Sequence, residues 1–159
     1  MQTLYQIALI THIIGLTTLA GVTLVDFVVA KQFWKQHAMD KTRAMAIHEA
    51  TSKFPLLFGI GMLLLILSGV TMMGITRGVF GEQIWFRIKF GLIILIIING
   101  VVVGRRQGSK LKRLLTQALT GQGNLINDLS KVKNRINWYH LTQIAFFITI
   151  FVLSVFKFN

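Results

Sequence analysis

Four histidines are the side chains of this sequence best suited to bind a transition metal or to move a proton at neutral pH: His12, His37, His48 and His140. His12 lies within a long apolar stretch and His140 at the start of another. Neutral imidazole is a common axial ligand of haem iron. The sequence contains no cysteine, which excludes thiolate metal sites, Fe–S clusters and covalently attached c-type haem. The histidines therefore favour a non-covalently bound b-type haem.

Four apolar segments must position these side chains, at about residues 4–30, 54–73, 84–103 and 139–156. Each is long enough to cross ~30 Å of hydrocarbon as an α-helix that rises ~1.5 Å per residue. Hydrophobic residues make up 53% of the 159 residues. Their concentration in four blocks indicates spans rather than one soluble core. We therefore predict an all-α integral membrane bundle of four transmembrane helices, forming a single membrane domain over residues 1–159.

Basic residues are shared unevenly among the loops, and the formal net charge is +12. Segments 31–53 and 104–138 hold most of them, whereas the loop near 74–83 holds only Arg77. By the positive-inside rule, loops 31–53 and 104–138 are cytoplasmic and both termini lie outside. Basic loops of this kind contact the anionic lipid membrane. No aromatic and basic recognition surface accompanies the charge, so we expect no nucleic-acid partner.

Both basic loops contain helix signals. Asp40 is placed to cap a short helix over residues 41–54. Between spans three and four, apolar residues recur at helical spacing among lysines and arginines over residues 109–136. This pattern predicts a cytoplasmic amphipathic helical segment, interpreted first as a hairpin on the membrane surface. The alternative is an extension of spans three and four beyond the membrane.

Two faces gather the polar residues of spans one and four. On span one the face, within an arc of ~60° at ~100° per residue, comprises Tyr5, His12, Leu19, Thr23 and Asp26. On span four it comprises His140, Gln143, Phe147, Phe151 and Ser154. Ionisable groups at membrane depth are costly, so both faces should point into the bundle. We expect His12 to bind one haem iron in the outer half.

A second iron is expected near the cytoplasmic face. His140 enters span four from that side and His48 precedes span two there, so the pair is the candidate ligand set. The cofactor prediction is therefore one or two haem b groups. The alternative for His48 is an ordinary loop histidine, and for His12 a polar residue bonded to a neighbouring helix.

Span three carries two basic residues near its outer end, Arg87 and Lys89, beside Trp85. Two residues apart on a helix, they point to different faces. One is expected to reach the outer headgroups and the other to face inward at the depth of His12. They are the catalytic candidates of this sequence.

Small residues in the first three spans would let a flat macrocycle lie between helices: Gly15, Gly21, Gly59, Gly61, Ser68, Gly69, Gly91 and Gly100. The alternative is that they only allow close helix packing. Such interface residues also lead us to expect a homo-oligomer.

Several of these residues resemble a known family. The motifs are Thr11-His12-Ile13-Ile14-Gly15, the pair Ala20-Gly21, and Trp85 followed by Lys89 at the entry to span three. They resemble the four-helix, haem-containing protoporphyrinogen oxidases of bacteria and the related copper-resistance-D-like membrane proteins. The resemblance covers spans one to three. It departs at Asp26, in a stretch where that family tends to carry an arginine.

The resemblance implies a b-type haem held by His12, with Lys89 as a nearby functional basic residue. It also implies a multi-pass protein of the bacterial inner (plasma) membrane. Together with the residues, it favours a haem protein with a redox, electron-transfer or gas-binding role. One alternative is a protoporphyrinogen IX oxidase that uses haem and quinone. Another is a copper or proton-coupled transporter without haem, whose path His12, Asp26 and the methionines would line.

Overall fold

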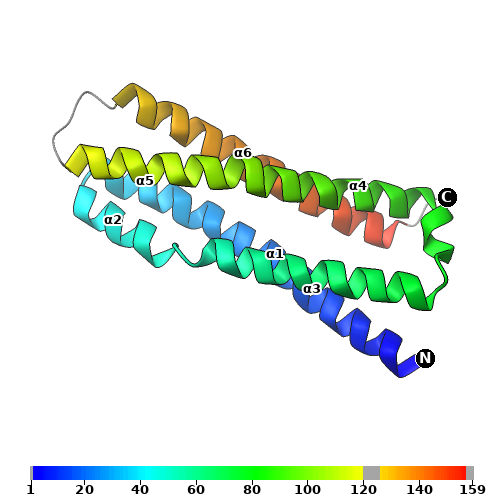
Figure 1. The fold of residues 1–159 in the computed structure, drawn as a ribbon. Coiled ribbons are helices and arrows are strands. Elements are labelled where there is room, and N and C mark those ends of the chain that lie inside the picture. The colour runs from blue at the N-terminus through cyan, green and yellow to red at the C-terminus, as the bar shows by residue number, and fades with distance from the viewer. Residues whose placement is uncertain (1, 120–125, 157–159) are drawn as a thin grey trace.

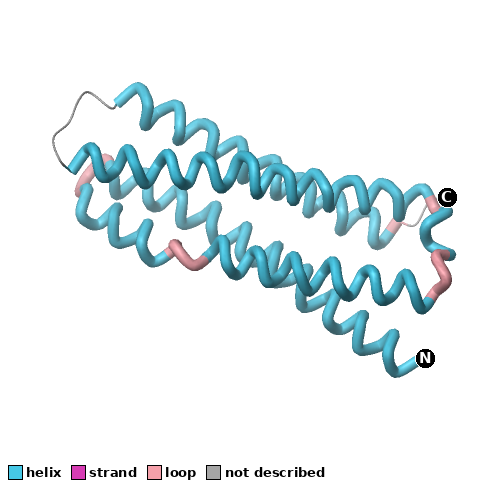
Figure 2. The backbone as a smooth tube through the Cα atoms, in the orientation of Figure 1, coloured by secondary structure: helices cyan, strands magenta, loops and turns pink. Residues whose placement is uncertain are grey.

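The computed structural model describes residues 2–119 and 126–156, which form helices joined by short turns (Figures 1 and 2). The elements in chain order are α1 (Gln2–His37), α2 (Lys41–Ala50), α3 (Phe54–Ile75), the short 3₁₀ helix η1 (Val79–Glu82), α4 (Ile84–Ile98), the π-helical segment η2 (Asn99–Gly104), α5 (Arg105–Leu119) and α6 (Ile126–Val155). No strand occurs in the described part of the chain.

Four helical stretches of the described residues are long and apolar enough to cross a membrane: Gln2–His37, Lys41–Ile75, Ile84–Ala118 and Asn127–Val155. The protein is therefore an all-α, multi-pass membrane protein, as the hydropathy pattern predicted. Each stretch extends beyond the apolar segment within it, so the bundle is longer than the expected spans. The helices continue into the basic segments instead of ending at the apolar border.

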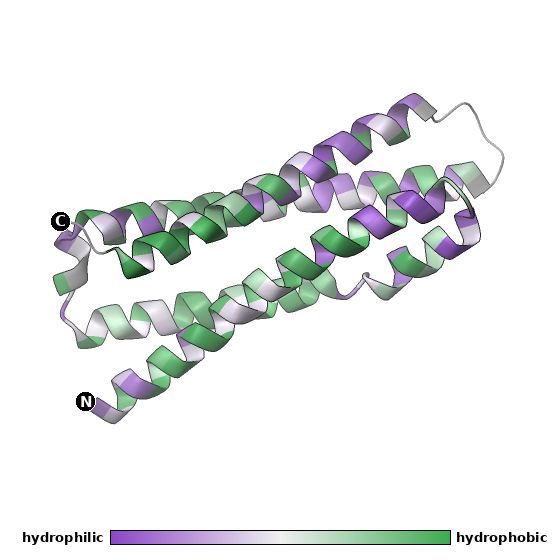
Figure 3. Cartoon of the chain, turned by 180° about the vertical axis from the view of Figure 1, so that it is seen from behind, coloured by the Kyte–Doolittle hydropathy of each residue, from purple (hydrophilic) through white to green (hydrophobic). Residues whose placement is uncertain are grey.

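The helices form two adjacent layers. α1 packs along α3, while the continuous α4–η2–α5 rod packs along α6, and α6 also contacts α1 (Figure 1). The two marked termini lie at the same end of the bundle as η1, and α2 lies at the opposite end. Hydrophilic residues gather at that opposite end (Figure 3). Both basic loops therefore share one end of the molecule, and their assignment to the cytoplasm stays a prediction.

Two glycines allow α1 and α3 to touch. A Cβ at Gly15 would lie 2.8 Å from the backbone nitrogen of Leu65, and one at Gly61 would lie 3.1 Å from Cγ of Leu19. No side chain fits at Gly15 unless the helices separate. Close packing thus explains these two glycines, whereas Gly21, Gly59 and Gly91 have nothing within 4 Å of the equivalent position.

Two apolar clusters fill the bundle. The central cluster consists of Leu19, Leu65, Ile96, Phe147 and Ile150. The basic-end cluster consists of Phe33, Ala44, Leu111, Leu114, Leu115 and Val132. The second cluster corrects the interpretation of α5 as half of a hairpin on the membrane surface. Its leucines are buried against other helices, so α5 extends span three, as the alternative stated.

The short helix α2 is confirmed with one change at its end. The carboxylate of Asp40 accepts hydrogen bonds from the backbone nitrogens of Thr42 at 2.8 Å and Arg43 at 3.3 Å. The helix ends at Ala50 and not at residue 54. Pro55 explains the difference, because a proline disfavours helical geometry in the preceding residue and suits the first turn of a new helix.

The inward face of α6 is only partly as predicted. His140, Gln143 and Phe147 are buried, but Phe151 and Ser154 are exposed. Ile150 and Leu153 take their place in the interior. Helical periodicity allows either set on the inward face. A residue three positions after Phe147 and a residue four positions after it lie on opposite sides of a line drawn through Phe147 along the helix. The position of the neighbouring helices decides between them.

Candidate polar sites within the bundle

His12 is oriented by a hydroxyl on the facing helix. Its Nδ1 atom lies 3.0 Å from Oγ of Ser68. The Ser68 hydroxyl in turn lies 2.6 Å from the carbonyl oxygen of Leu64 and 3.1 Å from that of Leu65. A hydroxyl has a single proton, which is donated here to a backbone carbonyl, so Oγ accepts the N–H of His12. The proton of the neutral ring is thereby assigned to Nδ1, and Nε2 keeps a lone pair.

Lys89 lies on the same side of the bundle as His12. Its charge is close enough to act on the imidazole, and its Nζ lies 4.6 Å from the centre of the buried Trp85 ring. Arg87 is exposed, and its Nε donates a hydrogen bond of 3.0 Å to the carbonyl of Gly81. The two basic residues thus have different partners. Arg87 bonds the turn around η1, and Lys89 is half-buried over the Trp85 ring.

His140 forms a pair with Asp26 across α6 and α1. Its Nε2 lies 2.9 Å from Oδ2 of Asp26, and the residue is only 3% exposed. The ring lies between Phe27 and Tyr139, with centroids at 5.9 and 5.0 Å. Its Nδ1 is buried and has no hydrogen-bond partner in the part of the chain that the structure describes. The sequence pointed to both residues on inward faces, but it did not bring them together.

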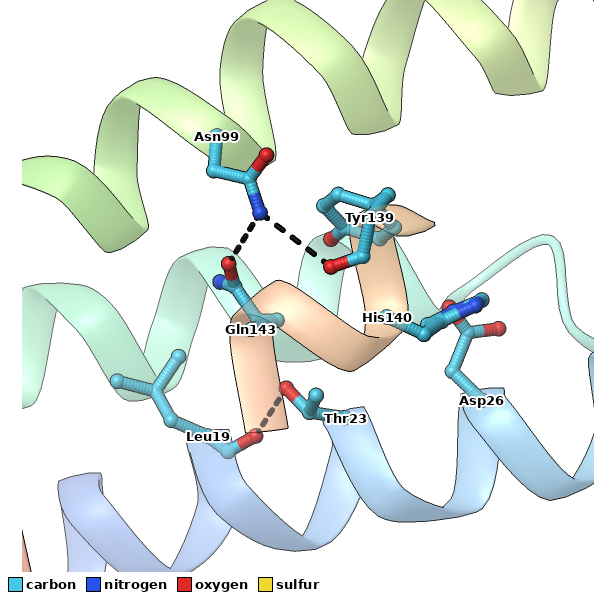
Figure 4. Close-up of polar contacts among 7 residues, drawn as sticks. All are labelled: Leu19, Thr23, Asp26, Asn99, Tyr139, His140 and Gln143. Carbon is cyan, nitrogen blue, oxygen red and sulfur yellow. Dashed lines mark hydrogen bonds and ion pairs between the residues drawn. The ribbon is translucent and has the colours of Figure 1, made fainter. Parts of the chain in front are cut away.

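A chain of amides lies beside this pair (Figure 4). Gln143 is fully buried. Its Oε1 accepts a hydrogen bond of 2.8 Å from Nδ2 of Asn99, and its Nε2 donates one of 3.3 Å to the carbonyl of Ile96. Nδ2 of Asn99 also lies 3.4 Å from the carbonyl of Tyr139. Asn99 was missed in the sequence. Its signal was a single amide side chain inside the third apolar block.

Asn99 opens the π-helical segment η2. A π turn disturbs the regular ladder of backbone hydrogen bonds, and inside a membrane the displaced groups need partners from neighbouring helices. Gln143 adds a bond to the carbonyl of Ile96, which also accepts from the backbone N–H of Asn99. Gly104 completes the contact, since a Cβ there would lie 3.0 Å from the Tyr139 ring. The amides thus fasten α6 to the irregular part of span three.

The other two histidines lie toward the basic end, outside the apolar part of the spans. The His48 ring centroid lies 6.2 Å from that of Phe33, and its charge interacts with Asp26. Burial lowers the pKa of His48, and nearby Lys112 adds to the effect. Burial and Lys41 likewise lower the pKa of His37. The described residues contain no group of three or more His, Asp or Glu side chains placed to hold one metal ion.

Of the predicted iron ligands, His12 has the arrangement that suits a haem. A ligating histidine usually donates its second ring N–H to a fixed acceptor, which sets the tautomer and the ring orientation. Ser68 provides that acceptor. His140 donates its Nε2–H to Asp26 in a similar way, but its other ring nitrogen, Nδ1, is buried between Phe27 and Tyr139.

Comparisons of the chain with protein-family models, curated proteins and solved structures gave no match. The functional argument therefore depends on the geometry of these sites.

Proposed function

We propose that this chain is a membrane protein that binds b-type haem through His12 and has a redox or electron-transfer role. The observation that carries the proposal is the hydrogen bond between Nδ1 of His12 and Ser68. It assigns the N–H to Nδ1, leaving the lone pair of Nε2 to bind iron. The haem would supply one-electron chemistry, or gas binding at an open axial position.

The residues around His12 have distinct parts in this proposal. Ser68 holds the ring, and the hydroxyl is itself fixed by the carbonyls of Leu64 and Leu65. Gly69 lies against the ring, with Cε1 of His12 3.6 Å from where a Cβ would be. The inward cation of Lys89 offers a partner for the carboxylates of a haem. Trp85, beneath that cation, restricts where it can lie.

The test is an optical spectrum of the detergent-purified protein, oxidised and then reduced, with a pyridine haemochrome count. We expect the α and β bands of a b-type haem and one haem per chain. His12→Ala should lose the bands, and the matched control His37→Ala should keep them. A protein that stays colourless after haem supplementation would overturn the proposal, and attention would turn to transport along His12 and Asp26.

A narrower form of this function is oxidation of protoporphyrinogen IX with quinone as electron acceptor. The position of Lys89 near His12 favours it, since a substrate with carboxylate groups would meet a cation beside the cofactor. Arg87, already bonded to Gly81, is the weaker of the two catalytic candidates. Complementation of a bacterial strain that lacks this activity decides the point. Growth with the wild-type chain and none with Lys89→Gln would support it, and failure of the haem-loaded wild type would exclude it.

A further inference from the structure

The Asp26–His140 pair is the most enclosed titratable site in the described bundle, and iron binding at His12 does not use it. The two sites are carried by residues 12 and 26 of one helix, which places them about 21 Å apart at ~1.5 Å per residue. The central apolar cluster of Leu19, Leu65, Ile96, Phe147 and Ile150 separates them. Whatever the pair does, it acts at a separate level of the membrane.

We propose that the Asp26–His140 pair is a proton-binding site, and that the exchangeable proton is held at Nδ1 of His140. Nε2 donates to Asp26, so Nδ1 is the ring nitrogen that can gain or lose a proton. It is buried without a hydrogen-bond partner among the described residues, and His140 as a whole is only 3% exposed. Buried polar atoms are nearly always hydrogen-bonded, and ionisable groups at membrane depth are candidate functional groups, so an unpaired nitrogen in a ring that contacts a carboxylate supports the proposal.

Charge decides which state the buried pair prefers. With one proton on the ring and Asp26 ionised, the pair would carry a net charge of −1; a second proton at Nδ1 makes it neutral. Asp26 exposes 37% of its side chain, so solvent reaches the carboxylate, whereas the ring opposite it is enclosed. A second proton on the ring would place an opposite charge 2.9 Å from the carboxylate and cancel the net charge of the pair.

The groups around the pair leave Asp26 as its counter-charge. On α6 the titratable neighbour is Tyr139, and on α2 it is His48, which acts on Asp26 and is itself close to Lys112 of α5. On α1, Lys31 is exposed and its Nζ lies 4.2 Å from the Phe27 ring centroid. The neighbours contributed by η2, Asn99 and Gly104, do not titrate. Asp26 is thus the carboxylate in direct contact with the ring.

A groove lies next to the pair on the side of the basic end. It begins at Phe27, the residue after Asp26 on α1, and is lined by Val28, Val29, Ile47, Ala50 and Phe54 together with the polar side chains of Lys31, Gln32 and Thr51. In the other direction the buried Thr23 and Gln143 come before the central apolar cluster, whose members have no polar side-chain group. We therefore assign proton exchange to the side of the groove.

The experiment is nitrogen-15 NMR of the full chain, labelled at the histidine rings and reconstituted in lipid nanodiscs at neutral pH. Ring nitrogen shifts distinguish singly from doubly protonated imidazole. His140 is assigned by elimination with His12→Gln, His37→Gln and His48→Gln, which replace neither residue of the pair. We expect a doubly protonated His140 in the wild type and a singly protonated one in Asp26→Asn. Asp128→Asn, the same change at an exposed position of α6, should leave the His140 signal in place.

The wild-type spectrum decides even if Asp26→Asn does not fold. A His140 ring that carries a proton on Nε2 alone in the wild type would overturn the proposal and leave the pair as a structural hydrogen bond. So would a doubly protonated ring that Asp26→Asn does not change. Neither result depends on haem, because the absence of haem bands would refute the function proposed for His12 and leave the His140 signal unaffected.

Discussion

His12 and His140 both lie on inward faces of spanning helices, but their partners give them opposite properties. His12 meets a serine hydroxyl that accepts its Nδ1–H, which leaves Nε2 neutral and able to bind a metal. His140 meets a carboxylate through Nε2, and this ion-pair geometry is the basis for proposing it as a proton-binding group. A histidine inside a membrane therefore becomes a candidate ligand or a candidate proton carrier according to the residue on the facing helix.

The largest effect should come from removing the two imidazoles separately. His12→Ala is expected to abolish haem binding, whereas His140→Ala should leave the haem content per folded chain unchanged, because the nitrogen of His140 that Asp26 does not engage, Nδ1, is enclosed by Phe27 and Tyr139. A pyridine haemochrome count on both variants measures this. If His140→Ala instead lost about half of two haems, a second iron at His140 with His48 would be supported and the contrast between the sites would fail.

Removing the hydroxyl that orients His12 should weaken the haem and not abolish it. Ser68→Ala is expected to lower haem affinity by about 10–100-fold, the usual effect of losing the partner of a ligating histidine. Thr71→Ala is the matched control, since Thr71 lies on the same helix, is exposed and bonds only the carbonyl of Leu67. Haem titration of the apo forms gives both values. Equal affinities for the two variants would show that Ser68 does not orient the ligand.

Removing the carboxylate that faces His140 should act on stability. Asp26→Ala leaves a buried N–H without its acceptor, and we expect a loss of about 1–2 kcal/mol in the free energy of unfolding, since polar contacts between membrane helices are worth less than their burial suggests. Asp128→Ala, at the exposed ion pair with Lys110, should change it by no more than about 0.5 kcal/mol. Reversible unfolding in mixed detergent micelles measures both. Equal losses would mean that the Asp26–His140 contact adds nothing to the fold.

The smallest effect concerns pH at the basic end. The pKa of His37 and of His48 is lowered in the fold, so each group binds a proton more readily in the unfolded chain. Their contribution to stability is complete above the unfolded value near 6.5 and is lost as the pH falls below it. The double variant His37→Gln with His48→Gln should flatten this decline in unfolding experiments between about pH 7 and pH 5. An unchanged decline would assign it to groups other than these two histidines.

The sequence predicted the elements better than it predicted the contacts between them. Four spans follow from apolar length, and the inward face of α1 follows from the spacing of His12, Leu19, Thr23 and Asp26, of which Leu19 and Thr23 are buried. Periodicity assigns a face to one helix, but it does not say which residue of another helix lies at the same height. The pairing of Asp26 with His140 depends on that register, so it became visible only in the fold.

The spacing of residues along the sequence could not predict two further features, the role of the Ser68 hydroxyl and the burial of the α5 leucines. Ser68 was noticed as a small residue, yet its importance lies in an oxygen aimed at His12. The leucines of α5 were expected to face lipid at the membrane surface. An amphipathic stripe shows that one face of a helix is apolar, but it does not show whether lipid or another helix packs against that face. In the fold, Phe33 and Val132 cover it.

The π-helical segment has a consequence for how span three serves two environments. A π turn accommodates one extra residue, and each residue turns an α-helix by ~100°, so the residues beyond it are rotated relative to those before it. α4 can present its surface to lipid while α5 directs Leu111, Leu114 and Leu115 to the basic-end cluster. Deleting one residue of Asn99–Gly104 would restore an unbroken α-helix and swing that leucine stripe out of phase. The π-helical segment thus sets the rotation of α5 about the helix axis relative to α4, so each helix can direct its own face to its own surroundings.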